Sequence, residues 1–434
     1  MCNKLSSLYE IFLQSSGVTT DSRHCPPRSL FIALKGASFN GNAFAAKALE
    51  AGCCHVVVDE VAYCPAGDNR YTLVDNGLKA LQALALYHRK QLGTKLIGIT
   101  GTNGKTTTKE LIAAVLKQKY NILNTEGNLN NSIGVPLTLL RLTKEHQLGV
   151  IEMGASHPGD IKELVDIAEP NFGIITNVGK AHLLGFGSFD GVIHTKGELY
   201  DFLRTKKDAT IFIDNNNPHL ASIAQGLHQV CYGTSEGLDI TGRVTGNSPF
   251  LSLEWKEKGQ KEWQTVQTQL IGAYNFTNVL AAITIGRYFE VTPSAIQTAL
   301  ESYTPQNSRS QLTKTARNTL IVDAYNANPT SMKAALDNFR QMEASNKMLI
   351  LGQMGELGAE SEAEHQQLVD YIDACGFTDV LLVGDNFLQA RHPYPTYPDT
   401  ASLIEALKVL HPQGKTILIK GSNSNKLSTI VDFL

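Results

Sequence analysis

A glycine-rich segment early in the chain carries the clearest chemical signal in the sequence. Residues 95–100 are apolar enough for a buried strand, and a helix is expected from Thr107 to about Lys119. A strand, a glycine loop and a helix in this order aim backbone N–H groups and a helix N-terminus at polyphosphate. In such loops a lysine reaches the outer phosphates and a hydroxyl reaches Mg²⁺, roles that we assign to Lys105 and Thr106. The loop comprises Gly101, Thr102, Asn103, Gly104, Lys105, Thr106 and Thr107.

The loop departs from the strict pattern G-x-x-x-x-G-K-[ST] at its first glycine. Ile99 occupies that position, and the nearest glycine is Gly98. A chance glycine turn would explain the loop alone, but not a strand directly before it and a helix directly after it. We therefore predict a phosphate-binding site.

Three further residues are candidates for metal binding or catalysis at the same edge of the sheet. Glu152 ends an apolar strand at 148–152, where phosphate-loop enzymes place an acid that reaches Mg²⁺. His182 follows the apolar run 173–177, so it is expected at the same edge. Taken alone, Glu152 would be a solvated cap, and His182 and Lys196 ordinary surface residues. The presence of the phosphate loop favours metal binding by Glu152. Spacing alone does not decide whether His182 and Lys196 have a function.

The elements that must position these residues divide the chain into domains. Residues 1–90 hold short apolar runs between Gly, Pro and Asn and end in a helical stretch, which predicts a small α/β domain. Residues 91–302 alternate strands and helices, which predicts a central domain like that of phosphate-loop ATPases, with a mostly parallel sheet. Within it, residues 251–255 and 264–270 suggest two-sided strands that form a hairpin on that domain.

A third domain is expected over residues 303–434. Pro305 and several small polar residues within 302–310 suit a hinge. Four buried-strand candidates follow and predict a Rossmann-like sheet; they lie at 320–322, 348–351, 380–383 and 416–419. The predicted fold class is therefore α/β with three domains.

The composition indicates which classes of partner the protein is not expected to bind. The chain has 434 residues, a formal charge of −3 and 18% charged residues, a balance that does not indicate nucleic acid or an acidic membrane surface as partner. No apolar run approaches the roughly 18 residues of a membrane span, and no signal peptide is recognised. The seven cysteines lack CxxC spacing, which favours reduced thiols in the cytoplasm.

Seven motifs resemble those of the Mur ligase family, which builds the peptide of peptidoglycan precursors. They span the three expected domains in the family's order. They are GTNGKTT at 101–107, GNLNNSIGVPLTLL at 127–140, EMGAS at 152–156, TNVGKAHL at 176–183, KGELY at 196–200, YNFTNVLAA at 274–282 and DAYNANPTSM at 323–332. Within the family, TDSR at 20–23, LFIALKG at 30–36, IGVPLTLL and YNANPTSM resemble the member that adds D-alanyl-D-alanine.

The resemblance implies roles for individual residues. Lys105, Lys196 and His182 would be catalytic. Thr106, Glu152, His182 and Lys196 would bind two Mg²⁺ ions, with Lys196 carbamylated so that its ammonium becomes an anion. ATP would be held by the loop together with Asn275 and Asn278 at adenine, Arg309 at the phosphates and Asp323 at the ribose. Without the resemblance, helix capping would explain the asparagines, and a solvated hinge charge would explain Arg309.

The resemblance also implies substrate-binding residues. Ser22, Arg23 and Asn40 would lie near uridine diphosphate in the N-terminal domain. The remaining candidates are Asn130, Asn131, Asn326, Asn328 and Ser331, the last three for the dipeptide. The family usually has an arginine after Lys420-Gly421-Ser422, but Asn423 stands here, so no role is carried beyond Ser422.

The implied reaction is amide formation driven by ATP. The carboxylate of UDP-N-acetylmuramoyl-tripeptide would attack the γ-phosphorus, and the amine of D-alanyl-D-alanine would attack the resulting acyl phosphate. ATP contacts on both sides of the hinge predict domain closure, in a protein expected to be a cytoplasmic monomer. Lysine and diaminopimelate at the third position of the tripeptide both remain compatible with the sequence.

Three other functions share some of these sequence features. A folylpolyglutamate-type synthetase shares the loop and the chemistry, but it lacks an N-terminal nucleotide-sugar domain, whereas about 90 residues precede the loop here. The enzyme that adds the third peptide residue is closer, and YNANPTSM argues against it. A nucleotide switch without catalysis would leave His182, Lys196 and Asp323 unexplained.

Overall fold

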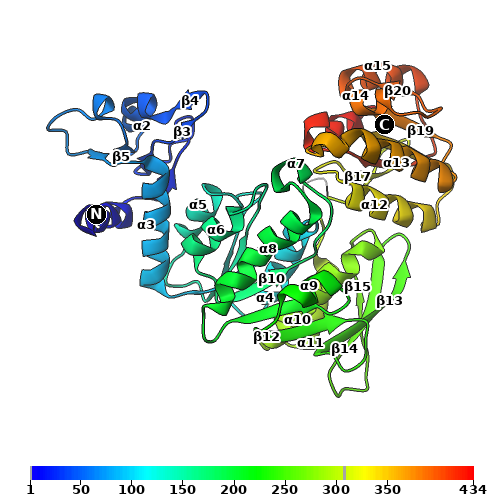
Figure 1. Cartoon of the computed structure of the whole chain (residues 1–434), viewed down its shortest axis with the longest axis horizontal. Coiled ribbons are helices and arrows are strands. Elements are labelled where there is room, and N and C mark those ends of the chain that lie inside the picture. Colours follow the sequence, from blue (N-terminus) through cyan, green and yellow to red (C-terminus); the bar gives the residue numbers. More distant parts are fainter. Residues whose placement is uncertain (1, 306–308) are drawn as a thin grey trace.

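Three domains lie along the chain in the computed structural model, which describes residues 2–305 and 309–434. Figure 1 shows the N-terminal and C-terminal domains on opposite sides of the central domain. Their sheets have four, nine and six strands, and a separate two-stranded hairpin belongs to the N-terminal domain. The predicted α/β class with three domains is confirmed. No helix within the described ranges is both long and apolar enough to cross a membrane.

The N-terminal domain is a small parallel sheet joined to the central domain by one long helix. The strand order is β1-β2-β5-β6. Helix α3 (Gly77–Leu92) starts at the capping side chain of Asn76 and ends at Gly93, whose φ is 66°. The other elements are α1 (Cys2–Gln14), β1 (Val18–Thr19), β2 (Leu30–Ile32), β3 (Lys35–Gly36), β4 (Phe39–Asn40), α2 (Ala45–Glu50), β5 (His55–Val58) and β6 (Tyr71–Leu73).

The central sheet has the order β15-β14-β13-β12-β11-β10-β7-β9-β8. All neighbours from β13 to β8 are parallel, whereas β14 and β15 pair antiparallel. The hairpin predicted from 251–255 and 264–270 is present as the antiparallel pair β14–β15. Not predicted is β13, which pairs with β12 and β14 and so joins the hairpin to the edge of the main sheet. The strands are β7 (Lys95–Thr100), β8 (Ile122–Asn124), β9 (Leu148–Glu152), β10 (Phe172–Ile175), β11 (Thr210–Asp214), β12 (His228–Gly233), β13 (Ile240–Asn247), β14 (Leu251–Glu257) and β15 (Gln264–Gln267).

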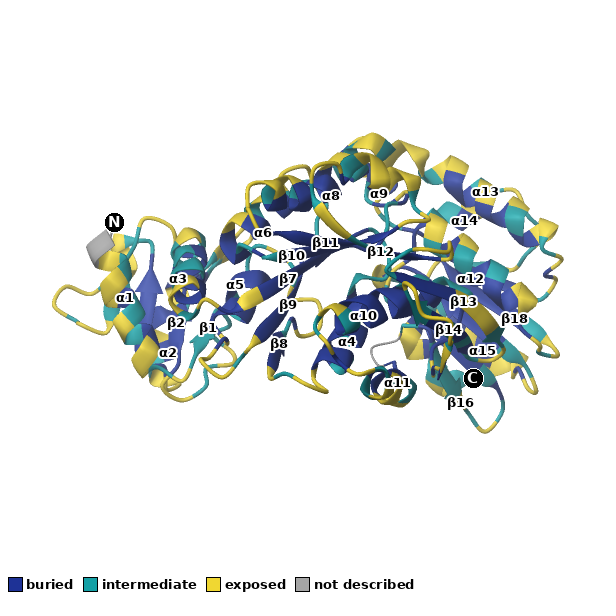
Figure 2. Cartoon of the chain, turned by 90° about the horizontal axis from the view of Figure 1, so that it is seen from below, coloured by how far each residue is buried: buried dark blue, intermediate teal, exposed yellow. Residues whose placement is uncertain are grey.

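Helices cover both faces of this sheet (Figure 2). Ile97 and Ile99 of β7 pack into the apolar cluster under α4 and α10, whereas Leu96 packs into the cluster on the opposite face. This alternation is what a strand buried on both faces requires. The helices are α4 (Lys105–Leu116), α5 (Gly134–Leu139), α6 (Asp160–Ala168), α7 (Leu183–Phe186), α8 (Phe189–Arg204), α9 (Pro218–Ile223), α10 (Phe276–Tyr288) and α11 (Pro293–Ser302).

The C-terminal domain has a six-stranded sheet with the order β16-β17-β21-β18-β19-β20. The four predicted strands correspond to β17, β21, β18 and β19, while the edge strands β16 and β20 were not predicted. Of the predicted hinge 302–310, residues 306–308 lie outside the described part. The elements are β16 (Gln311–Lys314), β17 (Thr319–Asp323), α12 (Pro329–Gln341), β18 (Lys347–Gly352), α13 (Ser361–Ala374), β19 (Val380–Val383), α14 (Asp385–Gln389), β20 (Thr396–Tyr397), α15 (Thr400–Leu410) and β21 (Thr416–Lys420).

A buried arginine fastens α3 to the central domain. Arg89 donates to the carbonyl oxygens of Ala168 and Glu169, both at 2.8 Å, at the C-terminal end of α6. Replacing Arg89 by methionine leaves both carbonyls unpaired and should lower the free energy of unfolding by about 2–4 kcal/mol in urea titrations. The control is Lys90→Met. Lys90 is 51% exposed and pairs with Glu169 on the surface, so we expect a loss below about 1 kcal/mol. Equal losses would contradict this assignment.

Candidate active site

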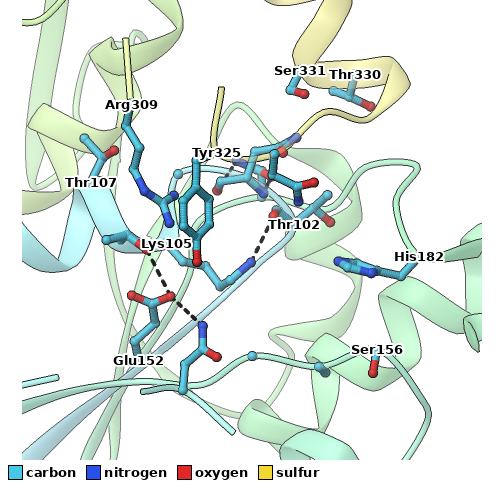
Figure 3. Close-up of a pocket in the computed structure, with 18 of the residues that line it drawn as sticks. Thr102, Lys105, Thr107, Glu152, Ser156, His182, Arg309, Tyr325, Thr330 and Ser331 are labelled. Carbon is cyan, nitrogen blue, oxygen red and sulfur yellow. Dashed lines mark hydrogen bonds between the residues drawn. The ribbon is translucent and has the colours of Figure 1, made fainter. Parts of the chain in front are cut away.

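A cavity of about 740 Å³ is lined by residues of both the central and the C-terminal domains. Figure 3 shows its interior, with Lys105 and Glu152 on one side and His182 on another. Most of the predicted site residues line this cavity: Thr102, Asn103, Gly104, Lys105, Thr106, Thr107, Asn130, Asn131, Glu152, His182, Asn275, Asn278, Arg309, Asp323, Asn326 and Ser331.

Two glycines let the phosphate loop pass close to its neighbours. Gly101 has a φ of 142°, and a Cβ there would lie 2.1 Å from Thr176 Oγ1. Gly104 has a φ of 76°, and its Cβ would lie 2.6 Å from Asn278 Oδ1. Only glycine suits a positive φ in such confined space. Because Gly104 turns the chain so sharply, α4 already begins at Lys105, earlier than predicted.

The Lys105 side chain folds back over the loop. Its Nζ donates to the carbonyl oxygens of Gly101 and Thr102, at 2.8 and 3.0 Å. Burial lowers the pKa of Lys105 to about 8; nearby Arg309 acts in the same direction and Glu152 opposes it. A phosphate group near Lys105 would favour the charged ammonium and supply better acceptors than two carbonyls.

Glu152 is the buried carboxylate at the centre of the site. Its side chain is 1% exposed, and its Oε1 accepts hydrogen bonds from Thr106 Oγ1 at 3.1 Å and Asn130 Nδ2 at 2.8 Å. Within the described part of the chain, Oε2 accepts no hydrogen bond. A buried oxygen with free lone pairs beside a hydroxyl is a fitting ligand set for Mg²⁺.

No group of three His, Cys, Asp or Glu side chains among the described residues could hold a metal by itself. Mg²⁺ at phosphate sites usually keeps several waters and takes one or two protein carboxylates together with substrate oxygens. Thr106 and Glu152 are therefore enough for a Mg²⁺ ion that arrives with a nucleotide.

His182 lies across the cavity from the loop, at the start of α7. It has a φ of 51°, and its Nδ1 lies against the carboxylate of Glu356, which belongs to the C-terminal domain. Burial lowers the pKa of His182, while Glu356 raises it. The predicted metal ligand is thus placed at the boundary between two domains, in contact with a residue that was not predicted.

Lys196 is buried behind the cavity, on α8, and does not itself line it. It is 2% exposed, its Nζ donates to Ala155 O at 3.4 Å, and it lies 5.0 Å from the centre of the Phe186 ring. Burial, followed by the charge of Lys105, lowers the pKa of Lys196 to about 7. Burial therefore favours the uncharged, nucleophilic amine form of this side chain.

The two predicted adenine contacts form a small buried network beside the loop. Asn278 Nδ2 donates to Asn275 Oδ1 at 2.9 Å, and Asn275 Nδ2 donates to Ile271 O at 2.9 Å. Thr108 Oγ1 donates to Asn278 Oδ1 at 3.0 Å. Neither asparagine side chain caps α10, so helix capping does not explain them.

The C-terminal side of the cavity begins at Arg309. Its guanidinium carbon lies 3.8 Å from the centre of the Tyr325 ring, and its Nε has no hydrogen-bond partner among the described residues. Figure 3 shows the two side chains alongside each other, above Lys105. Asp323 pairs with Lys420 at 2.6 Å, because β17 and β21 are parallel neighbours that place these two residues in register.

The residues predicted to contact the dipeptide differ in whether they line the cavity and in whether local hydrogen bonds already use their side chains. Asn328 and Ser331 form a capping box at the start of α12, so local structure already employs both side chains. Asn328 Nδ2 also donates to Asn103 Oδ1 at 2.8 Å, which joins the C-terminal domain to the phosphate loop. Asn328 does not line the cavity, whereas Asn326 does. Asn131 Oδ1 accepts from Gly134 N at 2.8 Å at the start of α5.

The three predicted uridine contacts lie on the N-terminal domain, apart from the cavity. Arg23 is 87% exposed and pairs with Asp21 at 2.9 Å, in the same turn as Ser22. Asn40 accepts from the backbone N–H of Asn42 at 3.0 Å, which starts the following turn. The structure therefore does not bring these residues together with the phosphate loop.

Among the residues in or beside the site that escaped prediction, three are relevant to its chemistry: Tyr325, Lys109 and Glu356. Tyr325 lies within the YNANPTSM motif, where only polar side chains were considered. Lys109 follows Lys105 by four positions on α4, a helical spacing that could have placed both on one face. Glu356 follows β18 in a loop with a φ of 62°, and no sequence pattern indicates its contact with His182.

Replacing Gly104 by alanine tests the close packing of the loop. The new Cβ would strain the positive φ and press on Asn278 Oδ1, so we expect ATP affinity to fall at least about tenfold by calorimetry. Gly93→Ala is a matched control, because Gly93 also has a positive φ of 66° but no atom within 4 Å of its Cβ position. Unchanged ATP affinity for Gly104→Ala would show that the loop accommodates a Cβ at this position and would contradict the prediction.

Comparisons with known proteins cover almost the whole chain. Residues 14–89 match the catalytic domain of the Mur ligase family, residues 99–286 the Mur ligase middle domain, and residues 308–423 the Mur ligase, glutamate ligase domain. These matches follow the order of the three structural domains.

Individual relatives extend the similarity. The UDP-N-acetylmuramoyl-tripeptide–D-alanyl-D-alanine ligase of Bacillus subtilis (strain 168) is 36% identical, covering 96% of this chain and 92% of its own length. The protein of the same name from Escherichia coli (strain K12) is 35% identical, covering 95% and 92%. A crystal structure of MurF from Acinetobacter baumannii has a TM-score of 0.87 and 29% identity, covering 99% of this chain and 97% of its own. With this similarity added to the loop and the cavity, the chain belongs to the Mur ligase family.

Proposed function

We propose that this protein is the ATP- and Mg²⁺-dependent ligase that joins D-alanyl-D-alanine to UDP-N-acetylmuramoyl-tripeptide. The products are UDP-N-acetylmuramoyl-pentapeptide, ADP and phosphate, for peptidoglycan synthesis. One observation carries the proposal: a single cavity gathers the phosphate loop, the buried Glu152 and the YNANPTSM segment of the C-terminal domain. The names of the two bacterial relatives, which match over nearly the full chain, support the choice of substrates.

Chemistry explains why such a ligase needs a phosphate loop. A carboxylate is a poor electrophile, so the tripeptide carboxylate first attacks the γ-phosphorus of ATP, displaces ADP and becomes an acyl phosphate. The amine of D-alanyl-D-alanine then attacks the acyl carbon, and phosphate leaves from the tetrahedral intermediate. Lys105 moves from the loop carbonyls to the phosphates, and Arg309 offers its unpaired guanidinium N–H from the other side of the cavity.

Mg²⁺ bound here would neutralise the phosphate oxygens and so make the γ-phosphorus more open to attack. Thr106 and Glu152 would hold one ion, and His182 together with a carbamylated Lys196 would hold the second. In this arrangement, Glu356 has to leave His182 when the second ion binds.

A carbamate on Lys196 suits its surroundings better than an ammonium does. The neutral amine, favoured by burial, can attack CO₂ to give an N-carboxylate and release a proton. The resulting anion would also remove the repulsion that Lys105 exerts on a charged Lys196.

The N-terminal domain, residues 1–90, would bind the uridine diphosphate end through Ser22, Arg23 and Asn40. Residues 91–302 would bind ATP, and residues 303–434 would complete the site and position the dipeptide. We place the reaction in the cytoplasm, in keeping with the six free cysteines of the described side chains. We also propose that the protein is a monomer.

Phosphate release distinguishes this ligase from its alternatives. With ATP, Mg²⁺ and UDP-N-acetylmuramoyl-tripeptide, we expect D-alanyl-D-alanine to stimulate phosphate release at least about tenfold. The reason is that phosphate leaves only after an amine attacks the acyl phosphate. Parallel reactions contain single amino acids or no amine, and mass spectrometry identifies the pentapeptide product. Stimulation by a single amino acid would assign another ligase step, and turnover indifferent to any amine would favour a nucleotide switch.

Lys196→Ala tests the carbamate. Removing this side chain should lower kcat by about a thousandfold or more, because the second ion loses its anionic ligand. In wild-type protein, removal of CO₂ and bicarbonate should lower activity reversibly, and ¹³C-bicarbonate should give a carbamate signal that Lys196→Ala lacks. Lys206→Ala is the control, since Lys206 also lies over a phenylalanine ring but is exposed. Full activity of Lys196→Ala would refute the carbamate.

A further inference from the structure

A second lysine on α4 is buried under the phosphate loop, and the proposed reaction does not use it. Lys109 is 1% exposed and lies one helical turn beyond Lys105, on the side of α4 that faces Glu152. A buried ammonium is costly unless opposite charge and hydrogen bonds compensate it. What compensates Lys109 therefore indicates its role.

Lys109 Nζ lies between two carboxylates without a close bond to either. It is 3.7 Å from Glu152 Oε2 and 3.9 Å from Glu110 Oε1, both beyond hydrogen-bond length. Its hydrogen bond goes to Gly127 O, at 3.3 Å. Burial lowers the pKa of Lys109, and the charges of Glu152 and Glu110 both oppose that shift.

The two carboxylates differ in what else holds them. Glu152 Oε1 is bonded to Thr106 and Asn130, but Oε2 accepts no hydrogen bond from the described residues, so Lys109 supplies its charge balance. Glu110 is 21% exposed, and its Oε2 accepts a hydrogen bond from the hydroxyl of Tyr303. Glu110 is thus fixed in place and retains one oxygen that faces Lys109.

We propose that Lys109 is a positioning residue whose charge is exchanged between Glu152 and Glu110. It balances Glu152 before nucleotide binds and shifts toward Glu110 when Mg²⁺ arrives with the nucleotide. The driving force is repulsion between the ammonium and a divalent cation on the same carboxylate. This inference rests on the proposed Mg²⁺ site at Thr106 and Glu152 and adds a counter-charge that makes room for the ion.

A double-mutant cycle on the full chain tests the exchange. ADP binding is measured by calorimetry at a series of Mg²⁺ concentrations in wild type, Glu110→Gln, Lys109→Met and the double variant. With Glu110→Gln, the ammonium stays on Glu152 and competes with Mg²⁺, so the Mg²⁺ concentration for half-maximal ADP binding should rise about fivefold. In the Lys109→Met background, the same change at Glu110 should have no effect, because the competing charge is gone.

The exposed pair Lys119–Glu290, at 3.1 Å just beyond α4, provides matched controls that should leave the Mg²⁺ requirement unchanged. Circular dichroism checks folding, and Lys109→Gln replaces Lys109→Met if the latter does not fold. An unchanged Mg²⁺ requirement in Glu110→Gln, or an equal shift without Lys109, overturns the exchange while leaving the ligase proposal intact. Wild-type protein that binds no ADP with Mg²⁺ would refute the nucleotide site and this inference together.

Discussion

The site is organised around one buried negative charge, the carboxylate of Glu152. A carboxylate that is 1% exposed has lost nearly all its water, so nearby donors and positive charge must compensate for it. Thr106 comes from the phosphate loop, Asn130 from the segment before α5, and Lys109 from the next turn of α4. Each of these segments must therefore pack against β9 in a single arrangement, and that arrangement also opens the loop toward the cavity.

Much of the fold could be predicted because its signals are local. Buried parallel strands appear as short apolar runs, and the loop glycines mark the turn into α4. Which strands become neighbours is not local: β13 joins β12 through pairing that neither segment reveals, so the sequence does not show how the β14–β15 hairpin is attached to the sheet. The residues gathered in the cavity lie near strand ends or within motifs. Glu356 and Lys109 could not be assigned, because their roles depend on which charges the fold brings to them.

The central domain is attached differently to its two neighbours. One apolar cluster includes Leu8 and Leu81 of the N-terminal domain together with Val135 and Leu139 of α5. On the C-terminal side, polar contacts carry much of the boundary near the cavity: Asn103–Asn328 at 2.8 Å, Lys180–Glu364 at 2.8 Å and the His182–Glu356 contact. Polar contacts exchange with water at little cost, whereas opening an apolar cluster exposes its whole surface. The C-terminal boundary also has apolar contacts, because Ile271 and Phe250 of the central domain pack into the apolar cluster of the C-terminal domain.

Because α3 is packed against the central domain, it holds the N-terminal domain at a fixed distance from that domain. The helix has 16 residues, which at a rise of ~1.5 Å per residue make a rod of roughly 24 Å. In the proposed reaction the N-terminal domain holds the nucleotide end of the substrate, and the peptide carboxylate must reach the phosphate loop, which begins after β7, the strand that follows α3. Each extended residue adds only about 3.5 Å of reach. In that reaction a precursor with too few residues would leave its carboxylate short of the γ-phosphate, so a fixed separation of the two sites would favour substrates of one length.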